Sequence, residues 1–500
     1  MEPQIDERST WRAAAGWFLV AAALRLFFLG RFGLWGDEFY SLENALRLFT
    51  PRMSASELAF PLFYLLERGV LELCGLAHAA VPDPKALQWA LRIVPALAGA
   101  IAAAAAFRCA RGFLSVRERH VLAALIAFSP WLLFFSQTAR FYTLLLALST
   151  PAAFELLRAS REASVKRGVI AAAWLLLAIL AHPTALLLLV GHLAAAIAAA
   201  AMGVRPLDRG LVRGLVGPAL LPLVLAVPAA IWPQAVTKTL GFKWSIDDAS
   251  VEGVAELLKG IGWNFGPIVA AVAFLGIPTL WRRDRALAVQ VVAGVAVPVA
   301  ALVSLAALGR AVEQRYLIAL IPWALLPAAA FLIELCDAIP ARARAVRWAV
   351  PALALLPYAP SLASEFIDGD RHDLAGAAEL VRSQLADGDG IVAETHALFG
   401  QYLPPDFPTK RLIEAPPYGL EERSLFSEMW EKCPRIWVVV PAQFENMNDI
   451  HRAFQEWAWC EGRLVRELWR PRLDYHQNPL RIFLVEPARA EKWDPQWRPG

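Results

Sequence analysis

Long apolar runs separated by short polar segments fill the first 360 residues of this chain. Runs long enough to cross a bilayer, which takes about 20 residues, recur from Trp11 to Pro360, although several runs are short. The pattern predicts a polytopic α-helical membrane protein with about eleven spans, centred near residues 22, 98, 128, 149, 176, 194, 223, 274, 297, 326 and 352. We expect kinks or breaks at Pro130, Pro183, Pro222 and Pro298, because proline interrupts helical hydrogen bonding.

The pattern changes after residue 360, where no further run is long enough to span a membrane. Short β-branched runs with polar ends predict strands, and helical patterns lie between them. The expected strands are 390–394, 435–440 and 481–485, and the expected helices are 374–385 and 449–459. The chain is therefore predicted to contain a membrane domain, 1–360, and a soluble α/β domain, 361–500. Because the second domain lacks a glycine-rich phosphate loop, a nucleophile elbow and zinc-ligand spacing, we assign no chemistry to it.

Charge placement predicts the orientation of the spans. Arginine and lysine gather in alternate loops, which is typical of cytoplasmic loops; these are 108–119, 158–167, 205–213, 282–285 and 342–347. With an odd number of spans and a cytoplasmic N-terminus, the soluble domain lies outside the cytoplasmic membrane. A formal net charge of +3 and the lack of a basic cluster among aromatics argue against nucleic acid as a partner. We expect a multi-pass inner-membrane protein.

The first outer segment, 35–88, is too long for a simple helix connection. Its runs LENALRLF and LFYLLERGVLEL have near-helical spacing of apolar residues, which predicts amphipathic helices on the membrane surface. The segment begins with the adjacent acids Asp37 and Glu38. A carboxylate there could act as a general base or hold a divalent cation on a phosphate, although a solvated loop would look the same.

Other polar groups fall at the same outer level on this topology. Arg140 follows Gln137 and precedes Tyr142, and the guanidinium fork of arginine suits phosphate oxygens. His182 and Arg315 also lie at outer helix ends. Each has an ordinary alternative, such as arginine reaching the membrane interface or histidine satisfied within the protein. Acid, cation and imidazole at one level are what a site for an anionic lipid headgroup needs.

The chain resembles the bacterial members of the GT-C superfamily of membrane glycosyltransferases, which includes protein O-mannosyltransferases and lipid A aminoarabinose transferases. The resemblance covers the membrane part and is densest in its first third. It is carried by the acid pair after the first helix, by Pro61-Leu62-Phe63-Tyr64, by Leu91-Arg92-Ile93-Val94-Pro95-Ala96-Leu97-Ala98-Gly99, by Ser136-Gln137-Thr138-Ala139-Arg140-Phe141-Tyr142, by Arg315-Tyr316 and by Leu320-Ile321-Pro322.

The resemblance implies inverting transfer of a sugar from a polyprenyl-phosphate carrier to a glycan, lipid or protein acceptor. Asp37 would be the catalytic base, and Glu38 would support it or contact the acceptor. Arg140, Arg315 and Tyr316 would bind the donor phosphate. The residues expected to line the site are Tyr64, Gln137, Tyr142 and His182.

Two positions depart from the family pattern. Ala59 stands where many relatives have histidine, and Thr138 where many have glutamate. We therefore assign no metal ligands, and a divalent cation stays open. A transporter or lipid flippase is the alternative function, since about eleven helices with polar residues would suit it too; a non-catalytic scaffold is a third. Cys433 and Cys460 could pair in an oxidising space or remain free thiols.

Overall fold

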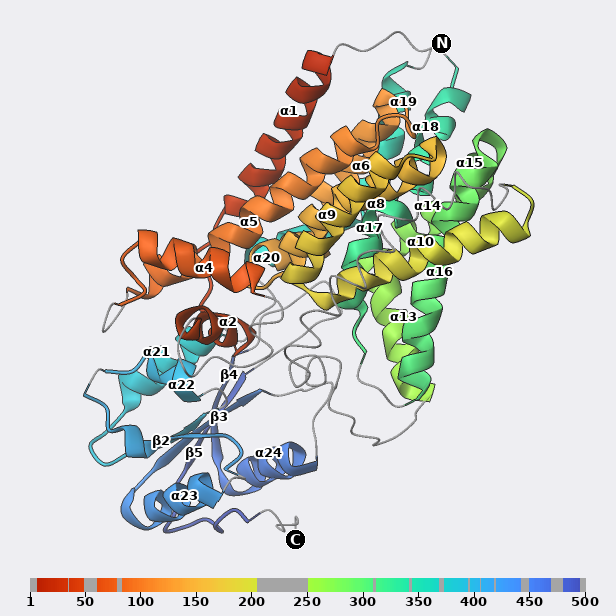
Figure 1. Ribbon diagram of the computed structural model, residues 1–500. Helices are drawn as coiled ribbons and strands as arrows, with labels where there is room; N and C mark the ends of the chain where they lie inside the picture. The colour runs from red at the N-terminus through yellow and green to blue at the C-terminus, as the bar shows by residue number, and fades with distance from the viewer. Residues whose placement is uncertain are drawn as a thin grey trace. The chain divides into compact units, whose positions relative to one another are not determined.

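The computed structural model falls into two compact units (Figure 1). Unit 1 comprises Met1–Leu29 and Ser41–Leu362, and unit 2 comprises Gly30–Tyr40 and Ala363–Gly500. Unit 2 thus includes a short segment that follows the first helix, which the apolar pattern had grouped with the membrane part. The structure describes residues 7–34, 36–48, 61–78, 83–204, 251–308, 312–340, 344–367, 373–393, 396–404, 406–417, 420–441, 449–468 and 480–494.

Helices form the regular elements of unit 1 throughout its described residues. They are α1 (Glu7–Leu26), α4 (Leu62–Leu73), α5 (Pro84–Cys109), α6 (Val116–Ala127), α7 (Pro130–Ser136), α8 (Tyr142–Glu162), α9 (Val165–Ala181), η1 (Pro183–Ala185), α10 (Leu186–Ala201), α13 (Val251–Phe265), α14 (Pro267–Leu275), α15 (Ile277–Arg283), α16 (Arg285–Ala307), η2 (Gln314–Leu320), α17 (Ile321–Ala324), α18 (Leu326–Ala338) and α19 (Arg344–Leu355). Two more helices, α2 (Gly36–Arg47) and α20 (Tyr358–Ile367), run across the division between the units.

Several of these helices are suited to a membrane. Within the described residues three are long and apolar enough to cross it, Pro84–Cys109, Pro183–Ala201 and Arg285–Ala307, and up to five spans result if each of two bent pairs counts as one. Helices lie at or beside every predicted span centre except the one near residue 223, which falls outside the described residues. The total of eleven spans stays a prediction.

The prolines act as helix starts more than as kinks. Helix α7 begins at Pro130, after Ser129 accepts the backbone N–H of Leu132, and it is bent by 57° from α6. A proline is well tolerated there because the first N–H of a helix has no partner inside the helix. Pro183 begins η1 in the same way. In contrast, α16 continues through Pro298 without a break, and Pro222 lies outside the described residues.

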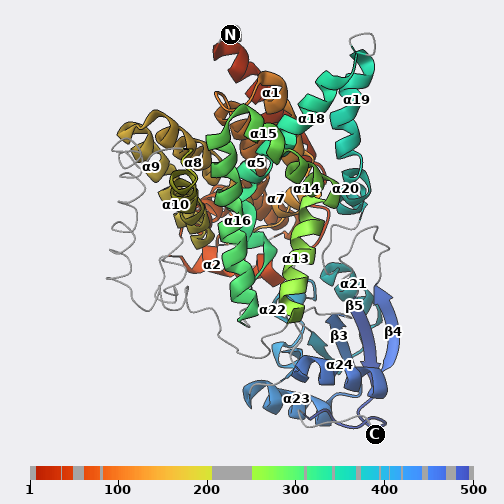
Figure 2. The same ribbon diagram turned by 90° about the vertical axis from the view of Figure 1, so that its right-hand side faces the viewer.

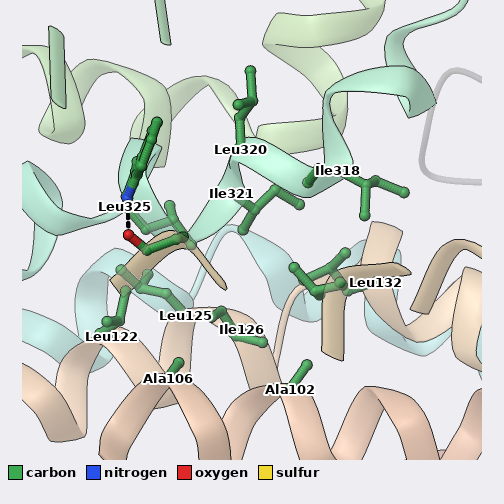
Figure 3. Close-up of a cluster of buried hydrophobic side chains, with 14 of the residues drawn as sticks. Ala102, Ala106, Leu122, Leu125, Ile126, Leu132, Ile318, Leu320, Ile321 and Leu325 are labelled. Carbon is green, nitrogen blue, oxygen red and sulfur yellow. Dashed lines mark hydrogen bonds between the residues drawn. The ribbon is translucent and has the colours of Figure 1, made fainter. Parts of the chain in front are cut away.

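Small side chains let the helices of unit 1 approach closely. Figure 3 shows Ala102 and Ala106 of α5 near the larger side chains of α6, with Leu132 and the η2–α17 segment closing the same cluster. Gly191 of α10 faces Gly294 of α16, where a Cβ atom on Gly191 would collide with the Gly294 carbonyl oxygen. Such contacts are typical of helix packing in lipid, where close van der Waals contact holds helices together. Helices α10 and α16 lie side by side in Figure 2.

A five-stranded mixed sheet forms the centre of unit 2. Its strand order is β2-β1-β3-β5-β4, with β2, β1 and β3 parallel and β5 antiparallel to both of its neighbours. The strands are β1 (Gly390–Ala393), β2 (Leu412–Glu414), β3 (Ile436–Pro441), β4 (Arg463–Leu468) and β5 (Leu480–Val485). The helices are α21 (Leu374–Gln384), α22 (His396–Gly400), α23 (Leu420–Lys432) and α24 (Asp449–Glu461), with the 3₁₀ turn η4 (Thr409–Arg411). The three predicted strands correspond to β1, β3 and β5, and the two predicted helices to α21 and α24.

Aromatic packing stabilises one side of this sheet. Phe454 and Trp457 of α24 stack with ring centroids 5.1 Å apart, and Phe426 of α23 packs edge-on against Trp457. Both helices thereby contribute to the core beneath β3 and β5. Cys433 is buried and Cys460 is exposed, and both are free thiols, so these two residues do not form a disulfide in this structure.

Candidate active site

An arginine and aromatic cluster lies at the start of α8 in unit 1. We define it as Arg140, Phe141, Tyr142, His182, Arg315 and Tyr316. The His182 ring stacks on Phe141, with centroids 4.1 Å apart and planes inclined by 14°. Tyr142 and Tyr316 lie 6.0 and 6.2 Å from the same imidazole. Three segments distant in sequence therefore meet around His182.

Both arginines of the cluster lie over aromatic rings. The Arg140 guanidinium carbon is 5.0 Å from the centroid of Phe141, and that of Arg315 is 5.4 Å from the centroid of Tyr142. Arg315 also forms an ion pair with Glu313, a residue that the sequence analysis had not singled out. Rings beneath a guanidinium hold its plane while leaving its edge to donate hydrogen bonds, which is the geometry that phosphate binding uses.

His182 is held in a defined orientation between α9 and η1, outside both helices. Its Nδ1 lies 2.8 Å from the Thr184 hydroxyl and accepts the backbone N–H of Thr184. In the neutral ring the proton is therefore on Nε2. Burial, with the charges of Arg140 and Arg315 added, lowers the pKa of His182 to about 3. A neutral imidazole that donates through Nε2 suits a residue that lines a site better than one that changes charge near pH 7.

The other two predicted lining residues have different surroundings. Tyr64 of α4 packs on Phe63, which in turn meets Phe141 edge-on at 6.1 Å, so α4 reaches the cluster through Phe63. The Gln137 amide donates hydrogen bonds to the carbonyl oxygens of Arg25 and Phe27, at 3.1 and 2.8 Å. Gln137 thus closes the C-terminal end of α1, and its contact with substrate stays a prediction.

Arg25 is a structural residue that sequence reasoning missed. It is fully buried, and its guanidinium donates to Ser136 Oγ at 2.9 Å and to the carbonyl oxygens of Ala127 and Ile126 at 3.1 and 3.2 Å. These carbonyls are left without helical partners by the bend between α6 and α7. A Cβ on Gly99 would lie 2.5 Å from Arg25 Nε. The glycine that ends the Leu91–Gly99 motif was the available signal for a buried neighbour.

The acid pair lies in unit 2, at the beginning of α2. Asp37 and Glu38 occupy the first turn of this helix, where the positive end of the helix dipole favours negative charge. Glu38 is fully buried and Asp37 is partly exposed. Leu34, three residues before Asp37, donates its backbone N–H to the Tyr402 hydroxyl at 3.0 Å. The acids are thus carried by a segment that is anchored on the C-terminal unit.

Metal binding was left open by the sequence. Among the residues that the structure describes, no three or more His, Cys, Asp or Glu side chains are grouped so that they could hold a metal ion.

Comparisons with known proteins identify the fold of this chain. No family model matches the chain, and no curated protein matches it significantly. Solved structures do match. ArnT from Cupriavidus metallidurans in the apo state is 15% identical, with a TM-score of 0.52 over 96% of this chain and 99% of that one. The chain has the GT-C fold.

Two further structures share this GT-C fold. ArnT from the same organism bound to undecaprenyl phosphate is 14% identical, with a TM-score of 0.53 over 94% of this chain and 97% of the other. The archaeal oligosaccharyltransferase AglB from Archaeoglobus fulgidus, in complex with an inhibitory peptide and a dolichol-phosphate, is 13% identical, with a TM-score of 0.50 over 85% and 69%. At such identities the likeness establishes the GT-C fold, and the sequence resemblance is confirmed at that level.

Proposed function

We propose that this protein is a glycosyltransferase that takes a sugar from a polyprenyl-phosphate donor at the outer face of the cytoplasmic membrane. The observation that carries the proposal is the convergence of Arg140, Arg315 and His182 at the start of α8. Two guanidinium groups held over rings beside a neutral imidazole suit a phosphate monoester or diester. Matching GT-C structures contain undecaprenyl phosphate or a dolichol-phosphate, which supports the same ligand class here.

The proposed reaction is an inverting displacement. Asp37 accepts the proton of an acceptor nucleophile, which attacks the anomeric carbon on the face opposite the phosphate. The bond between that carbon and the phosphate oxygen breaks, and the polyprenyl phosphate departs with the bonding electrons. Arg140 and Arg315, with Tyr316, stabilise the negative charge that gathers on the departing phosphate. Glu38 supports Asp37, while Tyr64, Tyr142 and His182 line the site.

The proposed topology follows from the same scheme. The basic loops would face the cytoplasm, and unit 2 would lie outside, where lipid-linked sugars and their acceptors meet. A reporter fused after Gly500 is expected to be active outside the cytoplasmic membrane. A cytoplasmic reporter would overturn this orientation.

The deciding experiment is release of sugar from a panel of radiolabelled polyprenyl-phosphate sugars by the purified protein, with membrane extract supplying acceptors. We expect Asp37→Asn to lower release by roughly 100-fold or more, because the amide keeps the size of the side chain but cannot accept the proton. Asp83→Asn is the matched control, since Asp83 caps α5 through Ala86 N–H and lies in the same predicted outer segment. Normal turnover by Asp37→Asn would refute the assigned base.

A further inference from the structure

Contacts of Arg31, Gly33 and Leu34 hold the segment that precedes the acid pair in place within unit 2. Arg31 donates from Nη1 to the Phe366 carbonyl oxygen at 2.8 Å, and Leu34 donates its backbone N–H to the Tyr402 hydroxyl at 3.0 Å. Leu34 itself is buried. Because a buried N–H without a partner is unfavourable, the Tyr402 hydroxyl determines where this part of the backbone can lie.

Gly33 makes the third contact, and its surroundings are too close for a larger side chain. A Cβ atom on Gly33 would lie 3.1 Å from Ala375 Cβ and 3.1 Å from the Tyr402 hydroxyl oxygen. Ala375 belongs to the first turn of α21, whose start is fixed where Asp373 accepts the backbone N–H of Gly376 at 3.0 Å. The glycine therefore lets the backbone approach both a helix end and the tyrosine.

Tyr402 is itself part of the sheet domain. It follows α22, and its backbone N–H donates to the Phe399 carbonyl oxygen at 3.1 Å. Phe399 is fully buried, and α22 packs on β1 and β2. A continuous series of contacts thus runs from the core of unit 2 through Tyr402 to Leu34, three residues before Asp37.

We propose that Tyr402 is a positioning residue for Asp37, and that the C-terminal unit sets the place of the catalytic carboxylate through it. This inference rests on the proposed function of Asp37. A shift of about 1 Å in a reacting group can change a rate by roughly 100-fold, so the loss of one anchoring hydrogen bond is sufficient to affect turnover. The unit to which the sequence assigned no chemistry thereby acquires a part in the reaction.

The first test removes the hydroxyl. In Tyr402→Phe we expect kcat to fall about tenfold while KM for the lipid-phosphate sugar stays unchanged, because the donor-phosphate ligands are untouched. Hydrogen exchange at the peptide that contains Leu34 should become faster, since its N–H loses a partner. Tyr358→Phe is the matched control, as Tyr358 donates its hydroxyl to the Phe265 carbonyl oxygen at 2.7 Å in unit 1. It should leave both quantities unchanged.

The second test uses the space around Gly33. Gly33→Ala should displace the segment and lower kcat about tenfold, because the added methyl group meets Ala375 and Tyr402. Ala375→Gly removes one of these neighbours, so the double variant Gly33→Ala/Ala375→Gly should recover about half of the loss on a logarithmic scale. A merely destabilising effect would add in the double variant instead of cancelling.

The outcomes separate the inference from the proposed function. Faster exchange at Leu34 in Tyr402→Phe with unchanged kcat would overturn the positioning role while leaving Asp37 as the base. Equal changes in kcat for Tyr402→Phe and Tyr358→Phe would overturn it as well. Full turnover in Asp37→Asn would instead refute the proposed function, whatever Tyr402 does to the exchange at Leu34.

Discussion

The two ends of α8 use arginine in different ways. At the C-terminal end, Glu155 accepts hydrogen bonds from Arg158 at 2.5 Å and from Arg167 at 3.2 Å. Arg158 also donates to the Cys109 carbonyl oxygen at the end of α5. Helix C-termini attract cations because their last carbonyls have no helical partners. These arginines join the ends of neighbouring helices and serve the fold.

At the N-terminal end, the guanidinium groups of Arg140 and Arg315 lie over aromatic rings. Their charges add to the effect of burial in lowering the pKa of His182. Helix geometry does not call for cations here, since the N-terminal end of a helix is its positive end. Glu313 supplies one anion to Arg315 at this end, and we propose that a donor phosphate supplies another. We therefore propose that the same residue type is structural at one end of α8 and functional at the other.

The largest effect expected from this contrast is at Arg315. Arg315→Gln removes a proposed phosphate ligand and should lower kcat/KM for the lipid-phosphate sugar by roughly 100-fold, since hydrogen bonds to charged groups contribute about 1.5–3 kcal/mol. The thermal midpoint should change little. Parallel measurements of sugar transfer and thermal unfolding in detergent check this. A large loss of thermal stability with retained activity per folded molecule would mean that Arg315 stabilises the fold and does not bind the donor phosphate.

The opposite pattern is expected at Glu155. Glu155→Gln leaves Arg158 and Arg167 without their shared carboxylate in a largely buried position. We expect the free energy of unfolding to fall by about 2 kcal/mol, with unchanged transfer per folded molecule. Thermal unfolding and transfer assays on the same preparation measure both. Reduced turnover in fully folded protein would show that the two ends of α8 are coupled.

From the sequence, the arginines at the two ends of α8 could be distinguished only by the side of the membrane on which each was predicted to lie. Loop charges and motifs located Arg140, His182 and Arg315 at one level, because helix ends can be counted along a chain. The partners of each cation could not be read in the same way. Arg25 lies inside an apolar run and appeared unremarkable, since the bend between α6 and α7 that needs its hydrogen bonds exists only in three dimensions.

The association of the acid pair with unit 2 was equally hidden. Leu34 and Tyr402 are 368 residues apart in sequence, and no local pattern predicts such a contact. The short β-branched runs did locate β1, β3 and β5, which are buried strands. The sequence analysis missed β2, which has only three residues, and β4, whose side chains are mainly exposed and carry little hydrophobic signal.

Glu313 offers a finer test of the N-terminal end. Its carboxylate pairs with Arg315 in the way that a donor phosphate is proposed to do. Glu313→Gln should therefore tighten inhibition by undecaprenyl phosphate about tenfold, or about 1.4 kcal/mol, because a competing charge is removed. Glu334→Gln is the control, since Glu334 pairs with Arg282 on a half-exposed surface. Weaker inhibition in Glu313→Gln would mean that Glu313 orients Arg315 instead of competing for it.

The smallest expected effect concerns an ion pair in unit 2 that resembles the structural end of α8. Asp389 has a fully buried side chain and accepts hydrogen bonds from Arg435 at 2.6 Å and from Trp437 at 3.0 Å. Burial alone would raise the pKa of Asp389, but the hydrogen bonds from Arg435, Ala386 and Trp437 outweigh it and hold this pKa below the usual carboxyl value.

A carboxyl group whose pKa is lowered on folding stabilises the folded state above its unfolded pKa, and this contribution disappears as the pH falls through the folded value. Asp389→Asn should therefore cost about 1 kcal/mol at pH 7, roughly 2–4 °C in the thermal midpoint of unit 2. The difference from the unchanged protein should shrink as the pH is lowered below the usual carboxyl range. Because this pair is assigned to the fold alone, turnover at pH 7 should be unaffected. A stability difference that does not depend on pH would mean that Asp389 and Arg435 stabilise unit 2 through packing. Charge pairing would then contribute less to the stability of this chain than the ion pairs at the C-terminal end of α8 suggest.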